Sequence, residues 1–327
     1  MESESVKHHL VVAGIINDQD FQQAKTCATY LERTFPSEVE STVLQLFETQ
    51  WEELLKNIKA TKKGKFHYHK GNYIVYVNDD EYLGNFEGLE NWALMNYRYS
   101  DNSNTIIYKR KAVLEFKKAI NDSKDRKFCF MEIRLGEDLP QRVIFELFTD
   151  IAPDSCENFR KLCAGSFTNK KGEKLTYKNT EFHRIVYGAF VQGGDLSKLG
   201  ISKFGQSIFD GYFPDETFEV KHDSVGLLGY CKKNGLKYTS TLKDFNTGTD
   251  EGNTVQNTVH MSQCTNECQF YVTTGAPLGF MDGKYVVFGR VIQGMRAFRK
   301  MEKMDSLNER PKEKIEISDC GEYYAKK

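Results

Sequence analysis

The 327-residue sequence lacks any long apolar stretch and any long run of charges of one sign. Its longest apolar run near the start, residues 10–16, is far too short to span a bilayer. The 45 basic and 46 acidic residues give a formal net charge of -1, without the basic patch typical of polyanion binding. The first residues are acidic and polar rather than a basic and then apolar leader. We therefore expect a soluble, cytoplasmic protein with no membrane or nucleic-acid partner.

A disulfide framework is also missing. The eight cysteines stand at irregular intervals, which favours a reducing compartment. Cys156 and Cys163 have the spacing of helix-core positions, where a thiol serves as a small hydrophobic group. One alternative is zinc, because His260, Cys264 and Cys268 would share one face of a helix. Three ligands beside an expected strand favour ordinary thiols, so we expect no metal and no cofactor.

In the first part of the chain, short apolar runs alternate with segments of helical periodicity. This alternation predicts a small α/β domain over residues 1–97, and the whole length is sufficient for two domains. Expected strands lie at 10–16, 43–47 and 73–77, and expected helices at 18–35 and 51–58 and around 89–93.

The order of these elements resembles the thioredoxin and glutaredoxin fold, but the residues for its redox chemistry are absent. Such chemistry needs a cysteine at the first helix N-terminus, where the helix dipole stabilises a thiolate. Residues 17–20 read Asn-Asp-Gln-Asp, and Cys27 lies in the middle of the expected helix. No proline precedes the strand that starts at Tyr73, where the resembled fold has a cis-proline. We therefore expect a docking module and no oxidoreductase.

Residues 98–127 are predicted to form a helical linker, because Ile106, Val113, Phe116 and Ile120 recur at helical spacing before a charged segment. After it the pattern changes to strands. Many strands with two helices predict a closed β-barrel capped at its ends over residues 128–323. Expected strands are 129–135, 142–148, 218–220, 225–230, 269–273 and 285–291, and helices follow Pro153 and Gly294.

The strongest candidate site is the stretch 182–195, which reads FHRIVYGAFVQGGD. It contains a cation, Arg184, and an amide, Gln192, in two short apolar runs that break at glycines. If these runs are neighbouring strands, alternate residues share a face, and both side chains point into the same groove.

Several motifs together resemble the cyclophilins over about the last two hundred residues. They are ENFRKLCAG, EFHRIV, VQGGD, SIFDGYFPDETF, CQFYVTT, MDGKYVVFGRVIQGM and ISDCGEY. The resemblance implies an eight-stranded antiparallel barrel capped by two helices, and peptidyl-prolyl isomerase activity. It identifies Arg184 as the catalytic arginine, Gln192 as the residue that orients it and Gln269 as a further site glutamine. Positions that line the proline pocket are Phe190, Tyr271, Phe280, Met281 and Tyr285.

The first domain and the LNERP segment at 307–311 resemble the cyclophilin subfamily called peptidyl-prolyl isomerase-like six. This resemblance implies a place in a larger protein assembly, such as the ciliary axoneme, and proline-containing peptides or protein segments as partners.

Isomerisation is a rotation about an Xaa-Pro bond, whose barrier of roughly 18–20 kcal/mol arises from amide resonance. An arginine that hydrogen-bonds the proline nitrogen of the twisted amide, beside an apolar pocket for the ring, is sufficient for catalysis. No nucleophile or proton transfer is needed.

The sequence departs from the family at several of these positions. An aromatic-methionine pair becomes Ala189-Phe190, and alternation along a strand would place the moved ring on the opposite face. Phe280 replaces a tryptophan, which predicts weak cyclosporin binding. Cys231-Lys232 replaces an Ala-Asn pair that binds the substrate backbone, and a polar insertion follows at about 236–266.

Two hypotheses remain open for the function. One is a weakly active or inactive isomerase that serves as a proline-peptide-binding or structural subunit, supported by these departures. The other is an active peptidyl-prolyl isomerase that assists protein folding, supported by Arg184, Gln192 and Gln269.

Overall fold

The structure, a computed structural model, describes residues 7–199, 206–232 and 266–324. The predicted insertion at about 236–266 therefore lies almost wholly outside the described residues, as do His260 and Cys264. Within these ranges no helix is both long and apolar enough to cross a bilayer.

The first domain is a four-stranded sheet covered by helices on both faces. The sheet order is β2-β1-β3-β4, in which β1 and β2 are parallel and the other neighbours are antiparallel. This arrangement confirms the thioredoxin-like α/β domain. Its elements are β1 (His8–Ile15), α1 (Gln19–Thr34), β2 (Val39–Leu46), α2 (Glu48–Thr61), η1 (Gly64–Tyr68), β3 (Tyr73–Val77), β4 (Glu81–Gly84) and α3 (Phe86–Tyr97).

The first helix begins at a polar cap and not at a thiol. The carboxylate of Asp18, the N-cap of α1, accepts hydrogen bonds from the backbone N–H groups of Asp20 and Phe21. Cys27 lies fully buried further along the helix, and burial raises the pKa of its thiol to about 12. A thiolate is therefore disfavoured at this position.

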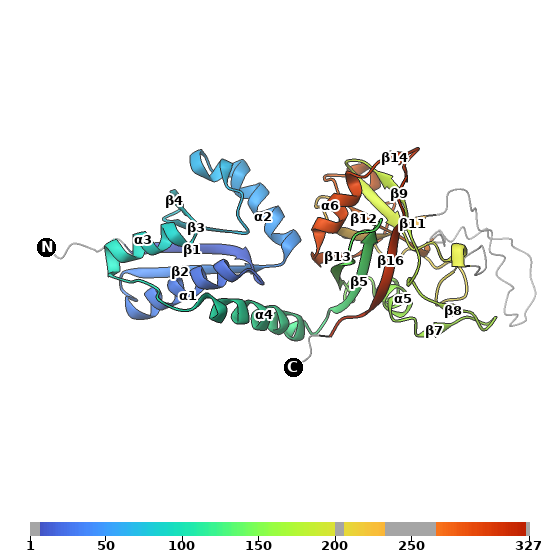
Figure 1. The fold of residues 1–327 in the computed structure, drawn as a ribbon, viewed down its shortest axis with the longest axis horizontal. Coiled ribbons are helices and arrows are strands. Elements are labelled where there is room, and N and C mark those ends of the chain that lie inside the picture. Colours follow the sequence, from blue (N-terminus) through green and yellow to red (C-terminus); the bar gives the residue numbers. More distant parts are fainter. Residues whose placement is uncertain (1–6, 200–205, 233–265, 325–327) are drawn as a thin grey trace, which may run out of the picture.

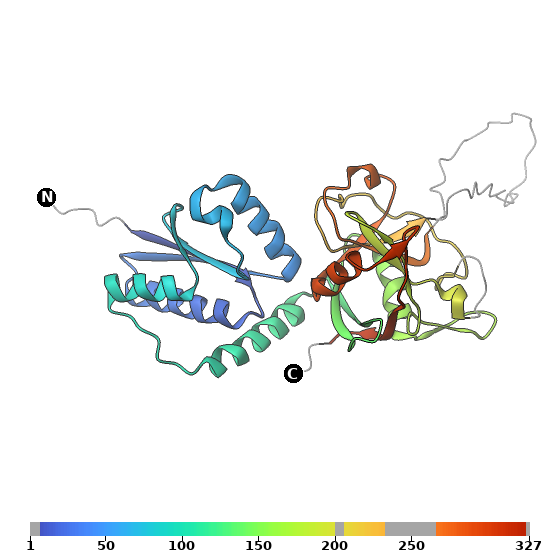
Figure 2. The ribbon, with the colours of Figure 1, turned by 45° about the horizontal axis from the view of Figure 1, so that its top comes forward.

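Helix α4 (Thr105–Asp122) connects the two domains, and Figures 1 and 2 both show it running from the first domain to the barrel. Its buried residues Phe116 and Ile120 join an apolar cluster with Ile16 of the first domain and Ile144 and Ile292 of the barrel. The linker helix is thus part of a core that both domains share.

The second domain is a nearly closed antiparallel barrel of eight strands in the order β16-β5-β6-β13-β11-β12-β10-β9. A bridge between Glu181 and Glu316 joins the two ends of this order. The barrel and its two capping helices confirm the predicted fold class. The elements are β5 (Lys127–Leu135), β6 (Gln141–Leu147), α5 (Pro153–Ala164), β9 (Phe182–Val186), β10 (Phe190–Gly193), β11 (Leu227–Lys232), β12 (Asn266–Thr273), β13 (Val287–Gln293), α6 (Met295–Glu302) and β16 (Ile315–Glu322). Shorter elements are β7 (Phe167–Thr168), β8 (Lys174–Leu175), η2 (Leu196–Leu199), η3 (Gly279–Met281), β14 (Ser306–Leu307) and β15 (Arg310–Pro311).

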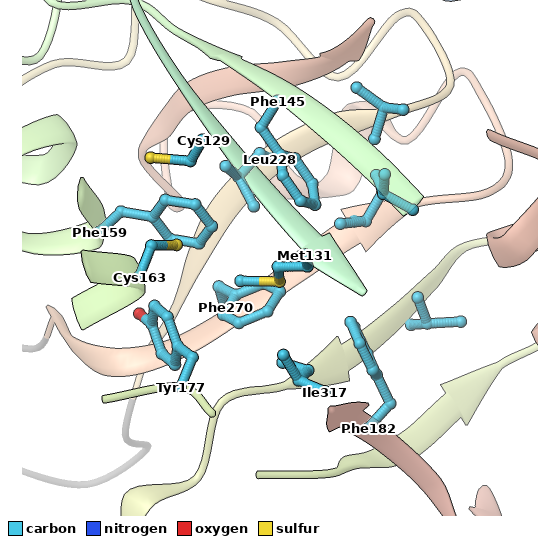
Figure 3. Close-up of a cluster of buried hydrophobic side chains, with 14 of the residues drawn as sticks. Cys129, Met131, Phe145, Phe159, Cys163, Tyr177, Phe182, Leu228, Phe270 and Ile317 are labelled. Atoms are coloured by element: carbon cyan, nitrogen blue, oxygen red, sulfur yellow. The ribbon is translucent and has the colours of Figure 1, made fainter. Parts of the chain in front are cut away.

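The barrel interior is filled by aliphatic, aromatic and sulfur-containing side chains (Figure 3). Phe159 of α5 contacts Phe270 of β12 edge to face, with ring centroids 5.3 Å apart. Cys163 lies beside them on α5, fully buried and without a disulfide. The helix-core spacing of Cys156 and Cys163 therefore predicted their place correctly.

One expected strand is wrong. Residues 218–220 form no strand, and the irregular segment before them binds the start of α5 instead. Both carboxylate oxygens of Glu216 accept hydrogen bonds there, from the backbone N–H groups of Asp154 and Ser155, at 2.8 and 2.7 Å. A short apolar run without a paired neighbour does not distinguish a strand from a packed loop.

The two domains also meet through α2 and the start of α6. Glu48 Oε2 accepts hydrogen bonds from the backbone N–H groups of Gly294 and Met295, at 2.6 and 3.2 Å. A carboxylate at a helix N-terminus is favoured by the free N–H groups and by the helix dipole. Arg299 of α6 forms an ion pair with Glu52 of α2. Helix α2 therefore caps and orients a helix of the barrel domain.

Candidate functional site

Three predicted site residues form a line of polar contacts across neighbouring strands. Arg184 on β9 pairs with Gln192 on β10 in the strand register, and β12 lies on the other side of β10. Arg184 Nη1 lies 3.5 Å from Gln192 Oε1, and Gln192 Nε2 donates to Gln269 Oε1 at 2.8 Å. The strands therefore bring Arg184, Gln192 and Gln269 together on one face of the barrel.

Arg184 has two further contacts. Its Nε donates to Glu309 Oε2 at 2.7 Å, and its guanidinium carbon lies 5.5 Å from the centre of the Phe190 ring. The carboxylate comes from the hairpin formed by β14 and β15, which is remote in sequence. The guanidinium is thus held by a carboxylate, an amide and a ring.

An apolar cluster lies next to this polar line. Its buried members are Ala189, Tyr271, Leu278 and Met281, and the partly buried side chains packed on it are Val186, Phe190, Cys231 and Tyr285. The Tyr271 ring lies 5.6 Å from the Phe190 ring and 6.1 Å from the Tyr285 ring, centre to centre. Four of the predicted pocket residues therefore meet in this cluster. Phe280 does not, because its side chain points outward and is 63% exposed.

The expectation that Ala189 and Phe190 lie on opposite faces is wrong. Ala189 belongs to the turn before β10, and the turn contains Gly188 at φ +73°. Strand alternation therefore does not apply between the two residues. Phe190 lies two residues from Gln192 on β10 and shares its face, while Ala189 packs into the same apolar cluster.

The Tyr271 hydroxyl is held by a buried histidine, His222, which the sequence pattern did not predict as a site residue. The Tyr271 hydroxyl lies 2.6 Å from His222 Nε2, and His222 Nδ1 lies 2.8 Å from Asp282 Oδ1. In the neutral tautomer that donates Nδ1–H to the carboxylate, Nε2 accepts the hydrogen bond of the Tyr271 hydroxyl. Hydrogen bonds from the backbone N–H and the ring of His222 hold the pKa of Asp282 below its usual value. The ring at the base of the cluster thus has a fixed orientation.

The same hydroxyl explains a glycine on the adjacent strand. A Cβ atom at Gly229 of β11 would lie 2.2 Å from Tyr271 Oη, a distance at which atoms overlap. Burial raises the pKa of Tyr271 well above its usual value, so the hydroxyl stays protonated. The position of the Tyr271 hydroxyl therefore depends on both its hydrogen bond with His222 and the absence of a side chain at Gly229. We call these three residues the matched unit.

The end of β11, where the family has its substrate-binding Ala-Asn pair, differs in chemistry. Burial raises the pKa of the Cys231 thiol, which packs against the apolar cluster. Lys232 Nζ lies 2.5 Å from Asp215 Oδ2 and 5.2 Å from the centre of the Phe218 ring. The Lys232 side chain is therefore anchored to the 214–218 segment of its own chain.

This arrangement suits an extended peptide that carries a proline. The arginine and two glutamines offer donors and acceptors to peptide groups, and the apolar cluster offers a surface to a pyrrolidine ring.

Sequence reasoning missed Glu309, His222 and Asp282. The segment 307–311 carries part of a family resemblance, and nothing in its local pattern connects it to Arg184.

No metal centre accompanies this site in the described part of the chain, where no three potential ligands cluster. Cys268, one of the three possible zinc ligands in the sequence, is buried in β12.

Comparisons with known proteins agree with this geometry. The family model "Cyclophilin type peptidyl-prolyl cis-trans isomerase/CLD" matches residues 130–322. A mouse protein named "Probable inactive peptidyl-prolyl cis-trans isomerase-like 6" is 31% identical over 317 residues, covering 96% of this chain and 91% of its own length. The human protein of that name is also 31% identical, over 316 residues, 96% of this chain and 91% of its own length. The mouse NK-tumor recognition protein is 35% identical over 203 residues, which is 61% of this chain and 12% of that protein. The chain therefore belongs to the cyclophilin family of peptidyl-prolyl cis-trans isomerases.

Proposed function

We propose that the barrel domain binds proline-containing peptide segments, with little isomerase turnover, as a binding subunit of a larger protein assembly. The observation that carries the proposal is the line of contacts from Arg184 through Gln192 to Gln269, beside the apolar cluster around Tyr271. It provides both polar and apolar contacts for a prolyl peptide.

Low turnover is supported by what surrounds this line. Arg184 is already paired with Glu309, and Lys232 is tied to Asp215 where the family has an asparagine for the substrate backbone. Phe280 points away from the cluster. The relatives that match nearly the whole chain are named probable inactive isomerases. Because only contacts that strengthen in the twisted amide lower the barrier, a site can bind prolines without speeding their rotation.

The experiment is peptide titration and exchange spectroscopy by NMR with Ala-Pro and Gly-Pro peptides. Wild type is compared with Arg184→Ala and with the control Arg134→Ala on β5, whose side chain is exposed to the same degree, 45% against 44%. We expect peptide-induced shifts with slow but detectable exchange in wild type and the control, and weaker shifts with exchange at background in Arg184→Ala. Catalysis far above background that disappears only in Arg184→Ala would show instead an efficient folding isomerase.

For the assembly, we propose the ciliary axoneme, which rests on the subfamily resemblance alone. Localisation of the tagged full chain in ciliated cells tests it, and a uniform distribution outside cilia would exclude it.

A further inference from the structure

Glu309 binds strand β9 through both its main chain and its side chain. Its carbonyl oxygen accepts the backbone N–H of Ile185 at 2.7 Å, and its carboxylate accepts Nε–H of Arg184 at 2.7 Å. The backbone contact fixes Glu309 beside Ile185, which is the residue next to Arg184. The Glu309 carboxylate therefore lies close to the Arg184 guanidinium.

The backbone at this position is unfavourable for a glutamate. Asn308 and Glu309 form the turn between β14 and β15, with φ values of +50° and +64°. Two-residue hairpin turns of this left-handed kind favour asparagine and then glycine, because other L-residues meet steric strain there. Asn308 suits its position, whereas Glu309 carries a cost that a glycine would avoid. Strain of this kind at a site suggests a role for the side chain that causes it.

We propose that Glu309 is a positioning residue that holds Arg184 in a resting pair and thereby slows prolyl isomerisation. The inference deepens the proposed function, since it rests on prolyl peptides binding beside Arg184. The twisted amide needs a guanidinium donor directed at the proline nitrogen, and no covalent bond is made or broken. Glu309 occupies the Nε donor and offsets the positive charge, so the remaining guanidinium N–H groups act more weakly on the proline nitrogen while the pair persists.

The exposure of the pair sets the size of the effect. The side chains of Arg184 and Glu309 are 44% and 48% exposed, so solvent screens their attraction. Pairs of this kind bias an equilibrium by at most about fivefold. Raising the salt concentration from about 0.1 M to about 1 M shortens the screening length from about 10 Å to about 3 Å, which weakens the pair further.

The test measures kcat/KM on an Ala-Pro peptide by NMR exchange for wild type, Glu309→Gly and Glu309→Gln. Glu309→Gly removes the carboxylate and relaxes the turn, so it remains informative if Glu309→Gln folds poorly. The matched control is Asp305→Asn, which removes the ion pair between Asp305 and Lys312 of the same hairpin segment without touching Arg184. We expect Glu309→Gly to be about two- to fivefold faster than wild type, and Asp305→Asn to be unchanged. Added salt should accelerate wild type and leave Glu309→Gly unaffected.

Two results would overturn the proposal. If Glu309→Gly binds the peptide, as seen in its NMR shifts, but turns it over no faster than wild type, Glu309 does not slow isomerisation. The proposed function of peptide binding would then still hold. If neither protein shows peptide-induced shifts, both proposals fail together.

Discussion

Thr49 joins the two domains by a buried hydrogen bond, so its hydroxyl is expected to stabilise both of them. Thr49 Oγ1 on α2 donates to the carbonyl oxygen of Val291 on β13 at 2.7 Å. The two residues are 4% and 0% exposed. The substitution Thr49→Val keeps the side-chain shape and its helix propensity but replaces the hydroxyl by a methyl group. The Val291 carbonyl then loses this donor inside the interface.

Loss of a donor to a buried carbonyl costs about 1–3 kcal/mol. For a domain of 150–250 residues, each kcal/mol lowers the melting temperature by about 2–4 °C, so we expect a fall of roughly 2–12 °C. The neighbouring contacts of Glu48 with the start of α6 remain, and they keep the domains associated in the folded state.

The two tryptophans, Trp51 and Trp92, both lie in the first domain, which makes the assay selective. Tryptophan fluorescence follows the first domain, and far-UV circular dichroism follows the whole chain. The control is Thr29→Val, because the Thr29 hydroxyl donates to Lys25 O within α1 and crosses no interface. In wild type we expect the fluorescence and circular dichroism melting curves to coincide. In Thr49→Val we expect either a lower melting temperature by both probes or a separation of the two curves. If Thr49→Val melts like Thr29→Val by both probes, the domains do not stabilise each other through this contact.

Three further predictions concern the buried groups. Gly229→Ala should lower stability by about 1–3 kcal/mol and weaken peptide binding, because its Cβ would overlap the Tyr271 hydroxyl; unchanged melting and NMR titration would contradict the matched unit. The native Cys27 thiol, with its pKa raised to about 12 by burial, should resist iodoacetamide at pH 8 and react after unfolding; rapid native alkylation detected by mass spectrometry would show that it is accessible. Burial lowers the pKa of His69 below its usual 6.5, so the unfolded chain binds the proton first and stability should fall as the pH drops below 6.5. The fluorescence of Trp51, whose ring lies 6.3 Å from His69, reports this loss, and His69→Gln should flatten the pH profile.

Local periodicity and composition were enough to predict much of the fold. Apolar spacing placed the helices and the buried Cys156 and Cys163, because a helix must bury one face. The polar residues at the first helix N-terminus exclude a redox thiol there, and Asp18 caps the helix. The prediction that Arg184 and Gln192 share a face depended on the two runs being neighbouring strands, and the register of β9 with β10 meets that condition. Alternation failed at Ala189, because a turn ends there and resets the direction of the side chains.

Only the tertiary structure decided what these residues touch. The contact between Arg184 and Glu309 joins positions 125 residues apart, and the contact between Glu48 and Gly294 joins positions 246 apart. The hydrogen bond from Tyr271 to His222 crosses 49 residues and explains why β11 needs a glycine. The physical reason is that the periodicity of a helix or strand fixes which way each of its side chains points, whereas the partner of a side chain depends on how the separate elements pack. The sequence thus determined which residues of each strand share a face with Arg184 and with Gln192, whereas strand pairing brought the two together and the packing of the β14–β15 hairpin placed a carboxylate on Arg184.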